Sequence, residues 1–93
     1  NRYNYASVTN NFNLNVVNNL LIDSNSSVTT GTVYLPSSPQ DGQICIIATN
    51  NAVSSVSIRS NIGSLILGSV TSLGANSNVK YQFVSSANKW FKI

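Results

Sequence analysis

Apolar and polar residues alternate in short runs along the chain, and polar turns separate the runs. Residues 12–16 alternate apolar residues with Asn, and residues 79–84 alternate in the same way. A period of two residues is typical of a strand with one buried face. Gly, Pro, Asn and Ser gather between the runs, with a turn signal every ~6–12 residues. The pattern predicts an all-β chain, and no stretch shows sustained helical periodicity.

The pattern predicts about eight short strands, of which the clearest succession lies in residues 33–58. They are expected at residues 12–16, 20–23, 33–35, 44–49, 56–59, 65–67, 79–84 and 89–93, with weaker signals at 3–5 and 70–73. Residues 44–49 are apolar on both faces, which fits the centre of a sandwich or a subunit interface. We therefore expect a small antiparallel β-sandwich or barrel-like head. A prism and an intertwined β-helix are the alternative topologies.

The chain is expected to form one compact domain with two parts. A chain of 93 residues is one domain at most and buries only a modest core of its own. We assign residues 1–32 to a stem-proximal β-repeat segment and residues 33–93 to a C-terminal β head. We also expect the chain to be the C-terminal piece of a longer protein.

Charged residues make up only 8% of the chain, against about 25% in an average domain. Asn, Ser and Thr supply about two fifths of the residues instead. The net charge of +3 comes from scarce acids and not from a basic cluster. Residues 89–92 interleave lysines with aromatics, but a terminal strand with solvated lysines explains them. We expect no nucleic-acid partner and no insertion into a membrane, because no run approaches ~20 apolar residues.

The usual catalytic and metal-binding side chains are missing. Without His or Glu, the chain has no Ser-His-Asp or Cys-His machinery and no imidazole metal site. Asp23 and Asp41 are its only acids, and both precede turns, where Asp normally bonds to the backbone. Cys45 stands alone in an apolar run and is expected to be a buried, inert thiol. We expect no enzymatic activity, metal or cofactor.

Binding by polar loops and an exposed aromatic remains as candidate chemistry. Amide side chains offer donors and acceptors that suit sugar hydroxyls. The candidates are Asn50, Asn51, Asn61 and Asn76 in predicted turns, with Trp90 as a stacking platform. Each has an alternative interpretation: Asn is favoured in turns for conformational reasons, and Trp90 would anchor a core or an interface.

Three short segments resemble the C-terminal ends of phage tail fibres and eukaryotic-virus fibres. They are residues 31–36 ending in Leu-Pro, the Asp-Gly-Gln turn at 41–43 before an Ile-rich strand, and the Trp-containing strand at 89–93. The resemblance implies a homotrimer that forms the distal head of a fibre on the virion surface. Its implied role is attachment to a receptor on the host cell, with a glycan as the expected class.

Three other functions are compatible with the sequence. The chain could serve only to trimerise and stabilise a fibre, with receptor binding elsewhere. It could be a monomeric β-sandwich carbohydrate-binding module of a larger secreted enzyme. An enzyme in its own right would have to use Asp23 and Asp41 as a pair of carboxylates.

Overall fold

The computed structural model describes residues 3–93, and within that range it contains nine strands and no helix. The strands are β1 (Tyr3–Val8), β2 (Phe12–Asn15), β3 (Asn19–Ser24), β4 (Val28–Leu35), β5 (Ile44–Thr49), β6 (Val53–Ser60), β7 (Leu65–Leu67), β8 (Ser77–Val84) and β9 (Lys89–Lys92). The predicted all-β class is confirmed. Each of the eight main predicted strands overlaps an observed one, and the weak signal at residues 3–5 is the start of β1.

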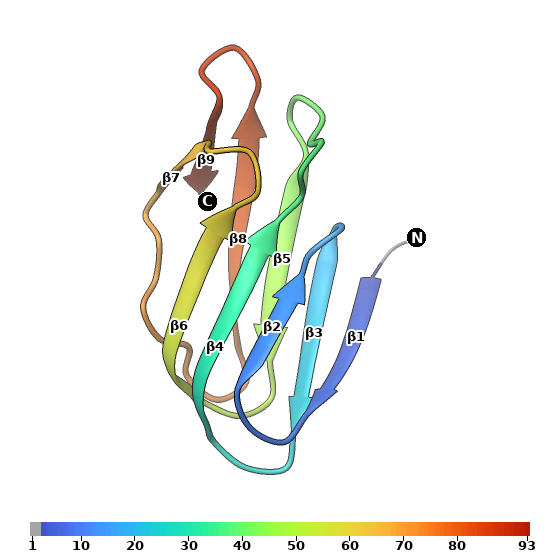
Figure 1. Cartoon of the computed structure of the whole chain (residues 1–93), viewed down its shortest axis with the longest axis vertical. Helices are drawn as coiled ribbons and strands as arrows, with labels where there is room; N and C mark the ends of the chain where they lie inside the picture. Colours follow the sequence, from blue (N-terminus) through green and yellow to red (C-terminus); the bar gives the residue numbers. More distant parts are fainter. Residues whose placement is uncertain (1–2) are drawn as a thin grey trace.

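The strands form two sheets, and the first six strands alternate between them. One sheet has six strands in the order β1-β3-β5-β8-β9-β7, and the other has three in the order β2-β4-β6. Figure 1 shows β2, β4 and β6 side by side, with β1 at one margin of the molecule and β7 and β9 at the other. Each pair β1–β2, β3–β4 and β5–β6 is therefore one coil, with one strand in each sheet.

The expected antiparallel pairing is wrong for most of the molecule. The pairs β1–β3, β3–β5, β2–β4, β4–β6 and β7–β9 are parallel, and only β5–β8 and β8–β9 are antiparallel. Parallel neighbours need a crossover connection, which is usually a helix. Here the crossover from β3 to β5 is β4, a strand of the opposite sheet. The chain is thus a short parallel β-solenoid of three coils with two facing sheets.

The coils stack because equivalent positions carry similar side chains. Val28 pairs with Val53, and Val33 pairs with Ile58, so apolar residues lie above each other inside the solenoid. Gly31 pairs with Phe12, whose ring occupies the space that a side chain at residue 31 would need. A glycine in β4 thus accommodates the largest side chain of β2.

The last coil is covered by the C-terminal third of the chain. The antiparallel hairpin β8–β9 adds to β5, and β7 adds to β9. On the other sheet, Leu73 forms a bridge with Val53, the first residue of β6. The sequence predicts a short strand or bridge at residues 70–73, and the structure has this bridge there. These segments cap one end of the solenoid.

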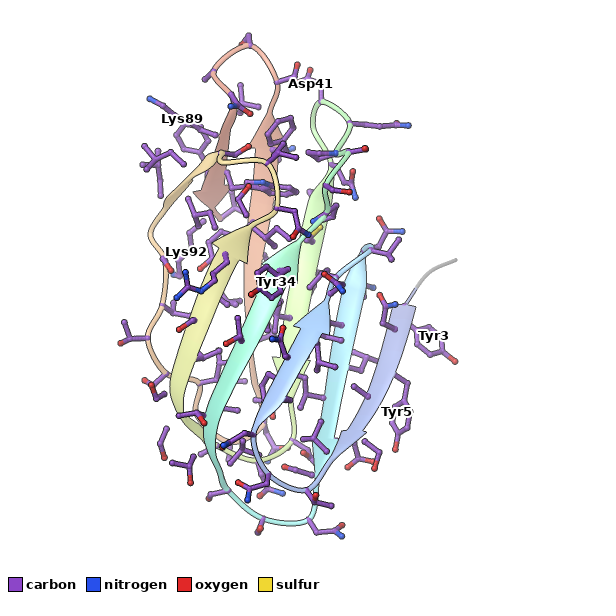
Figure 2. The ribbon with its side chains drawn as sticks, in the orientation of Figure 1. Tyr3, Tyr5, Tyr34, Asp41, Lys89 and Lys92 are labelled. Carbon is purple, nitrogen blue, oxygen red and sulfur yellow. The ribbon has the colours of Figure 1, made fainter. Side chains whose placement is uncertain are left out.

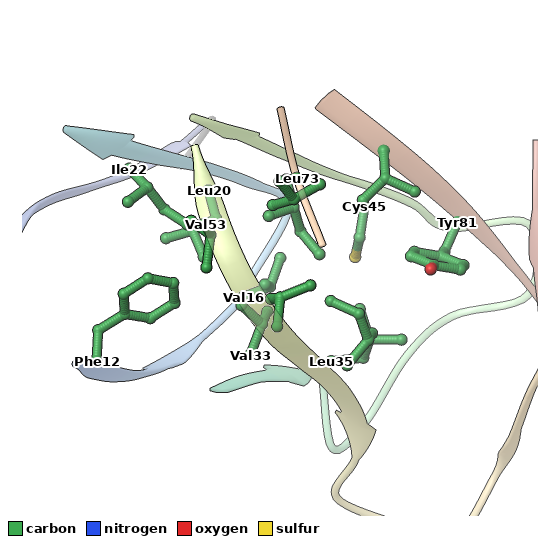
Figure 3. Close-up of a cluster of buried hydrophobic side chains, with 14 of the residues drawn as sticks. Phe12, Val16, Leu20, Ile22, Val33, Leu35, Cys45, Val53, Leu73 and Tyr81 are labelled. Atoms are coloured by element: carbon green, nitrogen blue, oxygen red, sulfur yellow. The ribbon is translucent and has the colours of Figure 1, made fainter. Parts of the chain in front are cut away.

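One apolar core lies between the two sheets (Figure 3). It contains Phe12, Val16, Leu20, Ile22, Val28, Val33, Leu35, Cys45, Ile47, Val53, Val56, Ile58, Leu73, Val79, Tyr81, Phe83 and Trp90. Residues from both sides of the expected 32/33 boundary contribute to it, and β4 runs across that boundary. The radius of gyration is 12.4 Å, against about 12 Å for a compact chain of this length.

Candidate functional site

Asn50 and Asn51 hold neighbouring coils together. The Asn50 amide nitrogen donates to the Asp23 carboxylate at 2.8 Å and to the Ser24 carbonyl at 3.0 Å, and its oxygen accepts the Ser24 N–H at 3.0 Å. The Asn51 amide donates to the same Ser24 carbonyl at 2.7 Å. These bonds satisfy backbone groups where β3 and β5 end. The alternative interpretation, a structural turn role, explains both side chains.

Asn76 lies beside Asn50 in the structure. Its backbone N–H donates to the Asn50 carbonyl at 3.0 Å, and its φ of 55° is in the left-handed region that Asn tolerates better than most residues. Both residues line an open, shallow depression of about 350 Å³ on the six-stranded sheet. The complete lining is Leu21, Ile22, Ala48, Thr49, Asn50, Asn76, Ser77 and Asn78. The structure thus brings two of the predicted binding residues into one site.

Asn61 is separate from this depression. It follows β6, and its amide donates to the Leu35 carbonyl at the end of β4 at 3.1 Å. Leu35 ends β4, and β4 runs back from the turn at which β3 finishes, so Leu35 lies at the opposite ends of the strands from Asn50. Asn61 therefore performs the same structural task as Asn50, at the far turn.

Trp90 is a core residue, and its prediction as a stacking platform is wrong. Its side chain is 0% exposed, with its ring centroid 5.1 Å from that of Phe83 and the two planes tilted by 49°. The alternation of β9 turns Trp90 inward and Phe91 outward, where Phe91 is 38% exposed. The exposed aromatic of this strand is therefore its neighbour.

A polar cluster that the sequence did not predict surrounds Asp23. The Tyr5 hydroxyl donates to one carboxylate oxygen of Asp23, and the Asn50 amide donates to the other. This hydrogen bond and the charge of Asp23 raise the pKa of Tyr5 above its usual 10.0, with a smaller contribution from burial. Tyr5 lies on β1 and Asp23 on β3, so only the parallel pairing of these strands brings them together.

The outward side chains of the six-stranded sheet, which we call the apolar face, include many large hydrophobic groups. Ile44, Gln82, Phe91 and Leu67 form one row across β5, β8, β9 and β7. Other apolar or aromatic members of this face are Tyr3, Tyr5, Leu21, Ile46, Ala48, Leu65 and Val84. Figure 2 shows Tyr3 and Tyr5 projecting from β1, away from the body of the molecule.

The outward side chains of the three-stranded sheet, which we call the polar face, have a different chemistry. They include Asn13, Asn15, Thr32, Tyr34, Ser57 and Arg59. Asn13, Thr32 and Ser57 form a row across the three strands. The polar face resembles an ordinary solvated sheet surface, whereas the apolar face does not.

Asp23 and Asp41 lie near opposite ends of β5. Asp23 is level with the residue after Thr49, and Asp41 precedes Ile44, so about 20 Å of strand separates them. A glycosidase pair needs ~5–10 Å. Each carboxylate has a structural partner, since Asp41 accepts the Ser85 N–H at 2.9 Å. Within one chain the two carboxylates do not form a catalytic pair.

Residues 3–93 contain no group of three or more His, Cys, Asp or Glu side chains that could hold a metal ion. The same residues include no helix long and apolar enough to cross a membrane. The lone Cys45 is buried as predicted, and its burial raises the pKa of the thiol to about 11 despite the opposing hydrogen bond from Gln43.

Comparison of the chain with protein families, curated proteins and solved structures gave no match.

Proposed function

We propose that this chain is the distal head of a viral or phage fibre and that it assembles as a homotrimer through its apolar face. The supporting observation is the difference between the two outer surfaces. Leu65 is 54% exposed, Ile44 43% and Phe91 38%, all on the six-stranded sheet. Apolar patches of this kind on a small domain typically mark an interaction site.

The surface and the charge of the chain suit self-association. A standard interface buries about 800 Å² of each partner, roughly one sixth of the 5097 Å² that this chain exposes. Lys80 and Lys89 are the lysines on this face, and their long stems lie along apolar surface while their charges reach water. With a net charge of +3, copies of the chain repel one another only weakly.

Paired lysine substitutions test which face assembles. Ile44→Lys with Phe91→Lys places two charges on the apolar face, on the strands that flank Gln82. Asn13→Lys with Ser57→Lys is the matched control, because these residues flank Thr32 on the polar face. We expect the first variant to have the mass of one chain and the control to keep the mass of three. An apolar-face variant that remains trimeric would refute the proposed interface.

Glycan attachment is the second candidate function, and the depression beside Asn50 favours it. Asn76 and Asn78 contribute further amides to its lining. Ala48, level with Asn78, is four residues along β5 from Ile44, so about 13 Å separates the depression from the Ile44–Phe91 row. Leu21 and Ala48 of the lining also belong to the apolar face, so the three depressions stay open only in a trimer that assembles through the Ile44–Phe91 row. Threefold binding would then strengthen weak contacts.

The attachment role is tested by glycan-array binding of the native chain and of Asn78→Ala. Asn78 is exposed and lines the depression, so its removal leaves the hydrogen bonds of Asn50 in place. Asn15→Ala, on the polar face, is the control. We expect loss of binding for Asn78→Ala only. Binding by a chain of monomeric mass would favour a carbohydrate-binding module, and a trimer without glycan or cell binding would favour a purely structural fibre domain.

A further inference from the structure

The two ends of the coil stack, formed by the β1–β2 coil and the β5–β6 coil, differ in whether their outer strand edges are covered. At one end β8 covers the edge of β5, and the segment around Leu73 covers part of β6, with the Val56 N–H donating to the Thr71 carbonyl at 2.9 Å. At the other end β1 and β2 each pair on one side only, with β3 and β4. Their outer edges carry backbone groups with no strand beside them within residues 3–93.

The core is also open at the β1–β2 end. Ala6 and Leu14 point inward but remain half-buried. Ile22, which pairs with Ala6, is 3% exposed, and Val33, which pairs with Leu14, is 0% exposed. The difference between paired residues shows that the first coil lacks the cover that it gives to the second.

Nothing in the sequence of these strands blocks further pairing. Residues 3–15 contain no charged residue and no proline, the usual devices that keep edge strands from pairing. The opposite end has another such device, because its edge strand in the six-stranded sheet, β7, is only three residues long. The capped end is protected in the way that terminal repeats of solenoids require, and the β1–β2 end is not.

We propose that the β1–β2 end binds a further coil of parallel β-solenoid, with one strand added to β1 and one to β2. Every stacked pair among the six coil strands is parallel, so an added coil continues an existing packing. Its inward residues must be apolar to cover Ala6 and Leu14. In a symmetric dimer, a single two-fold rotation would have to align the outer edges of both β1 and β2 with strands of the second copy. An added coil has one strand for each edge, and each strand can pair separately.

The chain itself supplies a probe coil for the test. Residues 19–45 are duplicated directly before Tyr3, so that Tyr3 follows Cys45 of the duplicate as Ile46 does in the native chain. Tyr3 and Ile46 both pair with Asn19, so the duplicated β3 meets β1 in the register that β3 has with β5. The matched control carries Leu20→Ser, Ile22→Ser and Val33→Ser in the duplicate only, which removes its inward apolar side chains.

Amide hydrogen exchange is the readout, with β5 and β8 reporting that the native part is folded. In the extended chain we expect exchange across residues 3–8 and 12–15 to slow about tenfold or more relative to the native chain, and the control to match the native chain. An extended chain with protected β5 and β8 but unchanged β1 and β2 overturns the proposal.

The native chain provides a second measurement that needs no insertion. We expect β1 and β2 to exchange faster than β3 and β4 at both low and high protein concentration. Protection of β2, which lies in the sheet opposite to the apolar face, that rises with concentration would identify a second copy as the occupant and overturn the proposal. Neither measurement depends on a trimeric mass, so this inference and the proposed function fail independently.

Discussion

On the three-stranded sheet the outward positions carry mainly Asn, Thr and Ser, whereas on the six-stranded sheet many of the corresponding positions carry Ile, Leu, Tyr and Phe. Both sheets use the same strand alternation, and both turn apolar residues toward the shared core. The inward pattern therefore determines the fold, and the outward pattern determines what the fold contacts. Four predictions test this separation, in order of decreasing expected effect.

Trp90→Ala should destabilise the chain strongly, and Phe91→Ala should not. The first removes a fully buried ring from the core and is expected to cost about 3–5 kcal/mol. The second removes a partly exposed ring from the apolar face and should cost about 1 kcal/mol or less. Urea unfolding at low protein concentration, where assembly contributes least, measures both. Equal losses for these neighbours would contradict the inward–outward assignment of β9.

Asn50→Ala should lower the free energy of unfolding by about 1–3 kcal/mol, because the Ser24 N–H loses the side-chain oxygen that accepts from it and the Asp23 carboxylate loses a donor. Asn78→Ala is the control, since Asn78 is exposed in the same depression. Thermal or urea unfolding distinguishes the two. If Asn50→Ala lost no more unfolding free energy than the control, Asn50 would not hold neighbouring coils together.

Stability should fall as the pH rises from about 9 through 11. Burial raises the pKa of Cys45 to about 11 and also raises that of Tyr81, while the hydrogen bond to Asp23 raises that of Tyr5. A raised pKa favours the protonated form in the folded chain, so its stabilisation is complete below the unfolded pKa and is lost as the pH passes the folded one.

Urea midpoints between pH 8 and 11 test this dependence. Cys45→Ala should flatten it more than Tyr5→Phe, because Cys45 is buried and Tyr5 is exposed to solvent. A larger effect of Tyr5→Phe would show that the apolar face, and not the core, contributes most to the loss of stability at high pH.

Asn13→Lys with Ser57→Lys should have the smallest effect, within about 0.5 kcal/mol of the native chain. Asn13 is exposed and Ser57 is half-buried, and both side chains point away from the core. Unfolding midpoints and solution mass should both stay unchanged. A loss of assembly in this variant would indicate that the polar face, and not the apolar face, forms the interface.

The sequence pattern was enough to predict the strands but not how they pair. Residues 44–49 and 65–67 were located with the observed bounds as short apolar runs between turn residues, a signal that is the same in parallel and antiparallel sheets. The first halves of β4 and β6 were missed because Thr29-Thr30 and Ser54-Ser55 place two exposed residues between inward ones. Comparing these two segments would have revealed the repeat and hence the parallel stack.

The candidate site was predicted only in part, for a related reason. Asn50 and Asn76 were identified as turn residues, but their shared depression depends on which strands lie side by side. Tyr5 and Asp23 meet only across a parallel pair, and that pairing was not predicted. Trp90 and Phe91 are adjacent in sequence, and only the register with β8 decides which of them is buried.

The solution mass of the native chain tests self-assembly through the apolar face most directly. Light scattering on a sizing column should give three times the 9.9 kDa of one chain, and the mass should persist on dilution. A mass of 9.9 kDa at every concentration would contradict the trimer and leave the apolar face of this chain without the proposed partner.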